Sequence, residues 1–343
     1  MTSRELGNAI FERKNTVGPA FWTGHPNDKT LPIYAKEWGI EPTREAIYDY
    51  LRDDCRWIVA NTHYRNDAGE LCAEFDMEWG HKRSSINTDG PLAEAETLED
   101  IRDYPWPKPE NLDFAPVYEQ IAKNADKLVF TGTWSCFYHI VADLFGMENY
   151  FVKMYTNPMI VEAVTERVAD YFVAANERFY AGMGDLGADV MFFGNDFGTQ
   201  LDLQISPECF RRFVLPATKK ILATGKKYGK KIMLHSCGSI WRVIPDLIDA
   251  GVDALHPIQA GAAGMDAVSL SQFKNDIAFV GGINAQSFLV DSTPEQVARE
   301  TERVWNVLGP NIVLSPSHEE ILPNVPAANM KAISDTAHRL RGE

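Results

Sequence analysis

The sequence predicts an α/β protein, a (β/α)8 barrel in a single domain that spans residues 1–343. From residue 115 onward, short apolar runs alternate with longer amphipathic segments, which is the pattern of parallel βαβ units. About seven strand-like runs can be counted, close to the eight of such a barrel. Neither G-x-G-x-x-G after an early strand nor G-x-x-x-x-G-K-[ST] occurs, so the barrel is favoured over a doubly wound nucleotide-binding sheet.

The first strand-like run is Val17–Trp22, and a largely helical excursion follows it, from about residue 24 to about residue 127. Within this excursion, Arg44–Ala60 is predicted as a helix, and Pro105, Pro107 and Pro109 mark an extended junction. The later predicted strands are Lys127–Thr131, Ala188–Phe193, Lys231–Leu234, Val252–Leu255, Ile277–Val280 and Asn311–Leu314. The principal predicted helices are Ala115–Asp126, Pro158–Gly182, Pro207–Tyr228, Pro294–Leu308 and Ala327–Leu340.

Composition excludes several classes of protein. A hydrophobic fraction of 45% and a charged fraction of 24% are typical of a globular protein, and no apolar run is long enough to span a membrane. A net charge of −15 argues against binding to nucleic acid or to anionic lipid. The five cysteines are scattered, and the first residues do not resemble a signal peptide, so we expect reduced thiols and a cytoplasmic location.

The stretch Lys231-Ile-Met-Leu-His-Ser-Cys-Gly238 carries the clearest chemical signal. It ends a strand-like run with His235 and Cys237 at positions i and i+2, which point to the same side of an extended segment. Imidazole and thiolate together suit zinc, although a third ligand must come from elsewhere in the chain. The alternative is a small buried cysteine beside a hydrogen-bonded histidine at a strand end.

Polar side chains follow every predicted strand, at the end of the barrel where catalysis takes place in such folds. They are Thr23, His25, Asn27, Thr131, Thr133, His139, Asn195, Asp196, Gln200, His256, Gln259, Asn284, Gln286, Ser315, His318, Glu319 and Glu320. This recurrence favours an enzyme with a polar pocket over a binding module. The aromatic residues Trp22, Trp134 and Tyr138 either wall such a pocket or belong to the core.

Several stretches resemble the uroporphyrinogen decarboxylase superfamily. They are Gly194-Asn-Asp-Phe-Gly-Thr-Gln200, Ile205-Ser-Pro-Glu-Cys-Phe-Arg-Arg-Phe213 with Pro216, Leu234-His-Ser-Cys-Gly238, Gly251-Val-Asp253, Gly281-Gly-Ile-Asn-Ala-Gln286 and Ser315-Pro-Ser-His-Glu-Glu-Ile321. The resemblance runs from about Gly18 to the C-terminus. It implies a (β/α)8 barrel with a helical excursion between the first two barrel strands, as the hydrophobic pattern predicts.

The superfamily has two chemically different branches. True uroporphyrinogen decarboxylases carry an arginine-rich loop after the first strand, whereas Thr23–Asp28 contains no arginine, so binding of a polycarboxylate tetrapyrrole is disfavoured. The chain is more similar to the zinc-dependent corrinoid and coenzyme M methyltransferases, whose ligands are H-x-C and a later cysteine. His235 and Cys237 match the first two, and His318 falls near the third, which implies the ligand set His235, Cys237 and His318. In the decarboxylase branch, a histidine at that late position contacts substrate instead.

We therefore predict a zinc-dependent methyltransferase that moves a methyl group between a small methylated or methoxylated substrate and a corrinoid protein or a thiol, as in O-demethylation. Asp196 and Glu319 are predicted as a further ligand or a proton relay, and His25 as a catalytic residue that faces the pocket. The predicted substrate-binding residues are Trp22, Trp134, Tyr138, Gln259, Asn284 and Gln286. No corrinoid-binding D-x-H-x-x-G is present, so a separate corrinoid protein is the expected partner, and a homodimer is expected by analogy.

Two alternatives remain open. One is a cofactor-free decarboxylase acting on a carboxylic acid, in which Asp76 or Glu78 would stabilise a protonated intermediate. The other is a non-catalytic protein that binds a corrinoid or tetrapyrrole.

Overall fold

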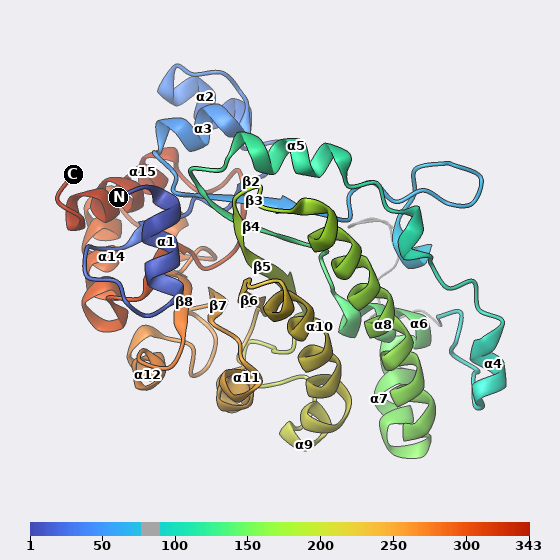
Figure 1. The fold of residues 1–343 in the computed structure, drawn as a ribbon. Coiled ribbons are helices and arrows are strands. Elements are labelled where there is room, and N and C mark those ends of the chain that lie inside the picture. Colours follow the sequence, from blue (N-terminus) through green and yellow to red (C-terminus); the bar gives the residue numbers. More distant parts are fainter. Residues whose placement is uncertain (77–89) are drawn as a thin grey trace.

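The computed structural model describes residues 1–76 and 90–343 (Figure 1). Among these residues, eight parallel strands form one sheet in the order β1-β9-β8-β7-β6-β5-β4-β3. The strands are β1 Ala20–Phe21, β3 Cys55–Val59, β4 Leu128–Gly132, β5 Ala188–Gly194, β6 Lys231–His235, β7 Ala254–Ile258, β8 Ala278–Ile283 and β9 Ile312–Pro316. This is a nearly closed barrel, and the predicted fold class is confirmed. The single-domain organisation stays a prediction.

Two aspartates complete the barrel where β1 and β3 meet. The Asp54 backbone amide donates to the carbonyl of Phe21 (3.1 Å), and the Asp54 carboxylate accepts from the Phe21 amide (2.8 Å). The Asp53 carboxylate accepts from the Thr23 amide (2.7 Å). Because β1 contains only two residues, these side chains replace the backbone ladder that a longer strand would form.

The predicted helix Arg44–Ala60 is wrong in its second half. Helix α3 covers Arg44–Tyr50, and the chain then turns at Arg52, which has a φ of 54°, into strand β3. Cys55, Trp57 and Val59 pack against the cluster of side chains that fills the barrel interior. This alternation is that of a strand, and tertiary packing overrides the helical spacing of the preceding apolar residues. The excursion therefore contains the second barrel strand.

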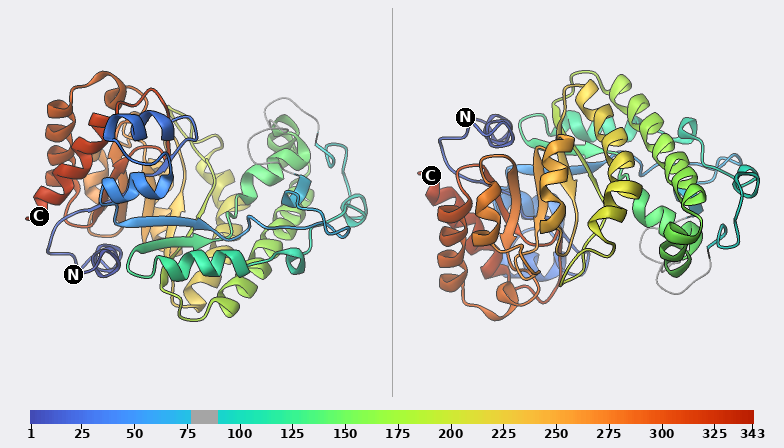
Figure 2. Two further views of the ribbon diagram at one scale, coloured as in Figure 1. Left: turned by 90° about the horizontal axis from the view of Figure 1, so that it is seen from above. Right: turned by 90° about the horizontal axis from the view of Figure 1, so that it is seen from below.

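Helices surround the strands in Figures 1 and 2. They are α1 Ser3–Phe11, α2 Leu31–Trp38, α3, α4 Leu98–Arg102, α5 Ala115–Lys123, α6 Phe137–Phe145, α7 Met147–Thr156, α8 Pro158–Met183, α9 Pro207–Cys209, α10 Leu215–Lys227, α11 Ile244–Ala250, α12 Ala267–Leu270, α13 Phe288–Asp291, α14 Pro294–Leu308 and α15 Ala327–Leu340. Within the described ranges, none of them combines the length and apolar character that crossing a bilayer requires. Figure 2 shows α6, α7 and α8 extending to one side of the barrel.

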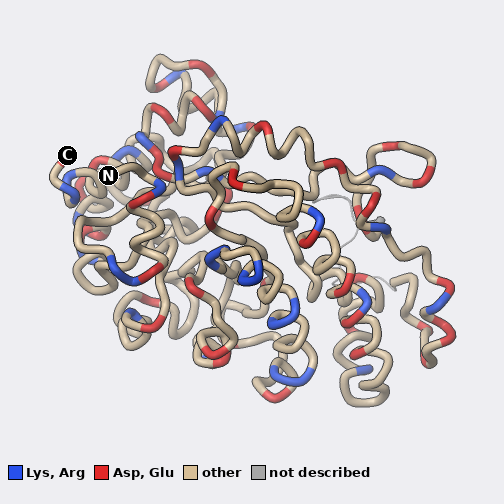
Figure 3. Tube along the Cα trace, in the orientation of Figure 1, with Lys and Arg blue, Asp and Glu red and all other residues tan. Residues whose placement is uncertain are grey.

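Two features position the functional site. A short parallel pair, β2 His25–Pro26 with β10 Glu320–Ile321, lies outside the barrel ladder. Inside the barrel, the rings of Trp22, Trp57, Trp134 and Phe192 contact one another and lie against His235 at the end of β6 and His256 within β7. Along the Cα trace in Figure 3, acidic and basic residues are interspersed.

Candidate metal centre

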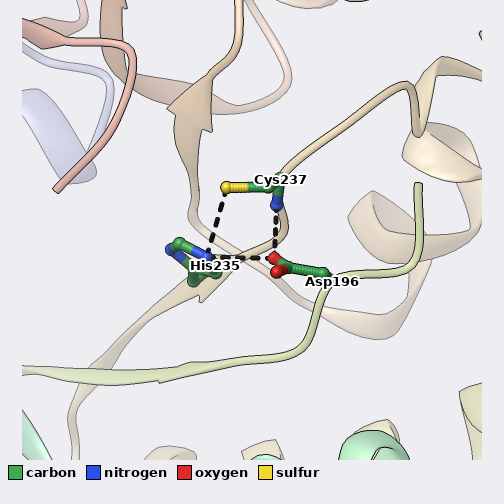
Figure 4. Close-up of side chains that lie close together, drawn as sticks. All are labelled: Asp196, His235 and Cys237. Carbon is green, nitrogen blue, oxygen red and sulfur yellow. Dashed lines mark hydrogen bonds and ion pairs between the residues drawn. The ribbon is translucent and has the colours of Figure 1, made fainter. Parts of the chain in front are cut away.

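Asp196, His235 and Cys237 converge at the carboxyl ends of β5 and β6 (Figure 4). The Nε2 atom of His235 lies 3.1 Å from the Asp196 Oδ1 atom and 3.7 Å from the Cys237 sulfur. The backbone amide of Cys237 also donates to Asp196 Oδ1 (2.8 Å). The structure thus brings together the two ligands that the i, i+2 spacing predicts, with Asp196 as a third donor.

Glycines allow the two strand ends to approach so closely. A Cβ atom on Gly194 would lie 2.4 Å from the Cβ of His235. Gly238 has a φ of +82°, and a Cβ there would lie 2.4 Å from the carbonyl carbon of Gly198. Both positions therefore require glycine, one for space and the other also for its backbone conformation.

A second group of donors lies on the other side of His235. Its Nδ1 atom is 3.0 Å from Nδ1 of His256 and 3.8 Å from Oε2 of Glu319. Glu319 Oε2 is buried without a hydrogen-bond partner among the described residues, and it lies 3.9 Å from Nδ1 of His318. The donor atoms of Cys237, His318 and Glu319 lie within 4.8 Å of one another, as do those of His235, His256 and Glu319. His318 thus lies near Cys237 and Glu319. It does not belong to the group of donors that contains both His235 and Cys237.

The electrostatics of these groups are strongly coupled. Burial would raise the pKa of Asp196, but the hydrogen bond and charge of His235 hold it well below its ordinary value. Burial would lower the pKa of His235, but Glu319, Asp196 and Cys237 together raise it well above 6.5. Burial raises the pKa of Cys237, whereas burial and the neighbouring His235 lower that of His256. The directions of these pKa shifts favour the charged forms of Asp196 and His235 and the neutral form of His256.

The geometry fits a tetrahedral zinc ion. With bonds of about 2.0 Å to nitrogen and about 2.3 Å to sulfur, such an ion holds these two ligand atoms about 3.5 Å apart. The His235 Nε2 and Cys237 Sγ atoms are 3.7 Å apart, so they need little movement to share an ion. The unpartnered Glu319 Oε2 is a further oxygen donor in the same region.

Other predicted site residues surround this centre. The ring of Trp134 lies 5.3 Å from that of His235, and the ring of Trp22 lies 4.9 Å from that of His256. Gln259 accepts a hydrogen bond from the Gly238 amide (2.6 Å), which holds the loop that carries Cys237. Tyr138 is buried, and its hydroxyl donates to Gln204 (3.2 Å).

Among the described residues, the side chains of the remaining predicted residues make no hydrogen bond to the donor cluster, although the His25 backbone amide donates to the Glu319 carbonyl (2.5 Å). Asn284 accepts from the amides of Gln286 and Ser287, which ends the turn after β8, and the Gln286 side chain is exposed. His25 lies on β2 with its ring 6.2 Å from that of Trp57. Glu78, suggested for a decarboxylase, lies outside the described residues.

Sequence reasoning did not assign roles to two histidines that the structure places here. His256 contacts His235, and Nε2 of His139 accepts a hydrogen bond from the Asp196 amide (3.1 Å). Both follow or end predicted strands, and that position was the only signal for them in the sequence.

Comparison with known proteins identifies the family. Residues 80–340 match the family model described as uroporphyrinogen decarboxylase (URO-D). The chain belongs to the URO-D family. A solved structure described as a methyltransferase from Methanosarcina mazei superposes on this chain with a TM-score of 0.69 at 15% identity. The match covers 99% of both chains and supports the barrel fold.

Two similar relatives of this URO-D family member are methyltransferases. A methylated-thiol–coenzyme M methyltransferase from Methanosarcina mazei is 25% identical over 47% of this chain and 41% of its own length. The methylcobamide:CoM methyltransferase MtbA from Methanosarcina acetivorans is 26% identical over 60% of this chain and 56% of its own length. The chain thus spans about half the length of the relatives it matches.

Proposed function

We propose that this protein is a zinc-dependent methyltransferase that moves a methyl group between a small methylated or methoxylated compound and a corrinoid protein or a thiol. The observation that carries this proposal is the preformed cluster of Asp196, His235 and Cys237 at the barrel mouth. The names of the two relatives, which include methylcobamide, methylated thiols and coenzyme M, support the same chemistry.

His235 and Cys237 would hold the ion, with Asp196, Glu319 or His318 completing its ligands. When bound, zinc would lower the pKa of a thiol or act as a Lewis acid on an ether oxygen or amine. Glu319 would accept the proton that a thiol loses, and this role is supported by its buried Oε2 atom, which has no hydrogen-bond partner among the described residues. In transfer to a thiol, the sulfur forms a bond to the methyl carbon as the cobalt–carbon bond of a methylated corrinoid breaks, and the electron pair of that bond stays on cobalt.

The aromatic side chains provide a dry wall for this reaction. Trp134 lies against His235, and Trp57 lies against Trp134 with 5.2 Å between ring centroids. Such rings exclude water from one side of the donors and offer an apolar surface to a methyl or methoxyaryl group. A separate corrinoid protein would approach the barrel mouth from the side of the donors that these rings do not cover.

Metal content and turnover test this proposal together. The protein, purified without added metal, is expected to carry about one zinc per chain, the number that a single site of this kind binds. The variant Cys237→Ser is expected to lose it, and Cys72→Ser, which changes an exposed cysteine, serves as the matched control. Methyl transfer from methylcobalamin to coenzyme M is then followed by the absorbance of the demethylated corrinoid. Negligible zinc in the parent would overturn the proposal and favour a cofactor-free decarboxylase or a binding protein.

A further inference from the structure

The side chain of His256 lies directly beside His235 in the barrel interior. His235 ends β6, and His256 is its register partner on β7. The two Nδ1 atoms are 3.0 Å apart, and His256 is only 1% exposed. Its ring is packed between Trp22 (4.9 Å) and Phe192 (5.2 Å), so it has little freedom to turn away.

The contact between two Nδ1 atoms limits where the protons lie. A hydrogen bond between them requires one atom to carry a proton and the other to accept it. Nε2 of His235 faces Asp196 and Cys237, and it offers a lone pair to an ion only when the proton of the neutral ring is on Nδ1. That proton then points at Nδ1 of His256. If His256 donated instead, the proton of His235 would lie on Nε2 and would block the metal.

Other acceptors for the Nδ1 proton of His235 are less suitable. Glu319 Oε2 is 3.8 Å away, which is beyond hydrogen-bond distance. An accepting His256 carries its own proton on Nε2, and that atom is buried without a partner in the described part of the chain. An unpaired buried donor destabilises the folded state, and this loss is consistent with a role in fixing the tautomer of His235.

We propose that His256 is a positioning residue for the metal centre: it accepts the Nδ1 proton of His235 and so turns the Nε2 lone pair toward the ion. This inference rests on the proposed function. Metal-binding histidines usually donate their second N–H to a carboxylate, a backbone carbonyl or water, so a neutral imidazole as the acceptor departs from the usual arrangement.

Two substitutions separate the hydrogen bond from the packing. His256→Asn keeps an acceptor near the position of Nδ1, and His256→Leu keeps similar bulk without one. Affinity for Co²⁺ is measured by competition with a chelator, and the thiolate-to-cobalt absorption band reports the ligand geometry independently of activity. His256→Leu is expected to bind Co²⁺ about 10–100-fold more weakly than the parent, with a shifted absorption band. The affinity of His256→Asn for Co²⁺ is expected to stay within about threefold of that of the parent. His63→Leu, a histidine in the loop after β3, is the control.

Unchanged affinity in His256→Leu, while the parent binds metal, would overturn this inference alone. Equal losses in both variants would overturn it as well, because they would indicate packing and not the acceptor. A parent that binds no metal would remove the proposed function and this inference together. Should either variant fail to fold, ¹⁵N-histidine NMR of the zinc-loaded parent decides the question. We expect a proton on Nδ1 of His235 and none on Nδ1 of His256, and the opposite tautomers would refute the inference.

Discussion

The buried carboxyl group of Glu74 makes the stability of this protein sensitive to pH. Its Oε1 atom accepts a hydrogen bond from the Tyr171 hydroxyl (2.5 Å), and its Oε2 atom accepts one from the Asn61 amide (2.8 Å). Asn61 in turn accepts from the backbone amide of Trp134, so the cluster connects the excursion to the mouth of the barrel. Burial raises the pKa of Glu74 from 4.5 to about 7, although both hydrogen bonds oppose this shift.

The substitution Glu74→Gln removes this titration while keeping the shape of the side chain. Because the folded pKa is raised, the neutral carboxyl group stabilises the folded state fully below about pH 4.5, and this stability is lost as the pH rises through about 7. A shift from 4.5 to about 7 corresponds to about 3 kcal/mol. The free energy of unfolding of the parent, minus that of Glu74→Gln, should therefore fall by about 3 kcal/mol between about pH 4.5 and about pH 8.

Urea unfolding at a series of pH values, followed by tryptophan fluorescence, measures this difference through the midpoints, provided that the slopes agree. Glu110→Gln, which changes an exposed glutamate, is the control and should follow the parent at every pH. Parallel curves for the parent and Glu74→Gln would show that the carboxyl group is not buried as described. A difference that grows with pH would show that the folded state stabilises the carboxylate, and the reasoning would fail in sign.

Three further predictions concern the site and the closure of the barrel. Asp196→Asn should weaken zinc binding by about tenfold or more, because Asp196 contacts both His235 and the Cys237 amide, and chelator competition measures this loss. Gly194→Ala should displace His235, lower the zinc content and destabilise the fold by about 1–3 kcal/mol, and normal zinc with normal unfolding would contradict the close approach. Asp54→Asn should destabilise the protein by about 3–5 kcal/mol in urea unfolding, because it removes the buried charge that pairs with Arg341 (2.6 Å), and an exposed-pair variant such as Asp335→Asn should not.

The architecture could be predicted from sequence where elements are long and strongly patterned. Helices α14 and α15 begin and end at their predicted residues, and α8 differs from its prediction by one residue at its C-terminal end. The π-helical turn Phe210–Val214 joins α9 and α10, which together lie within the predicted Pro207–Tyr228. Strand β3 could not be recognised, because only four residues separate it from α3 and it carries the buried Arg56 among its apolar residues. Its strand character depends on β4, with which it pairs along its whole length.

In the candidate site, too, local contacts could be predicted from the sequence and contacts between strands could not. His235 and Cys237 could be placed together because an extended segment directs residues i and i+2 to one side, and that geometry is local. Asp196 and His256 reach His235 from β5 and β7, so their contacts depend on the stagger between neighbouring strands, which no local pattern reports. In the structure, the backbone amide of Asn195 donates to the carbonyl of His235 (3.0 Å), and the backbone amide of Ser236 donates to the carbonyl of His256 (2.7 Å). A change of one residue in either register would turn the side chain concerned to the outside of the barrel. The candidate donor cluster therefore depends on the two registers between three adjacent strands, and the H-x-C motif supplies only the part that a single strand can determine.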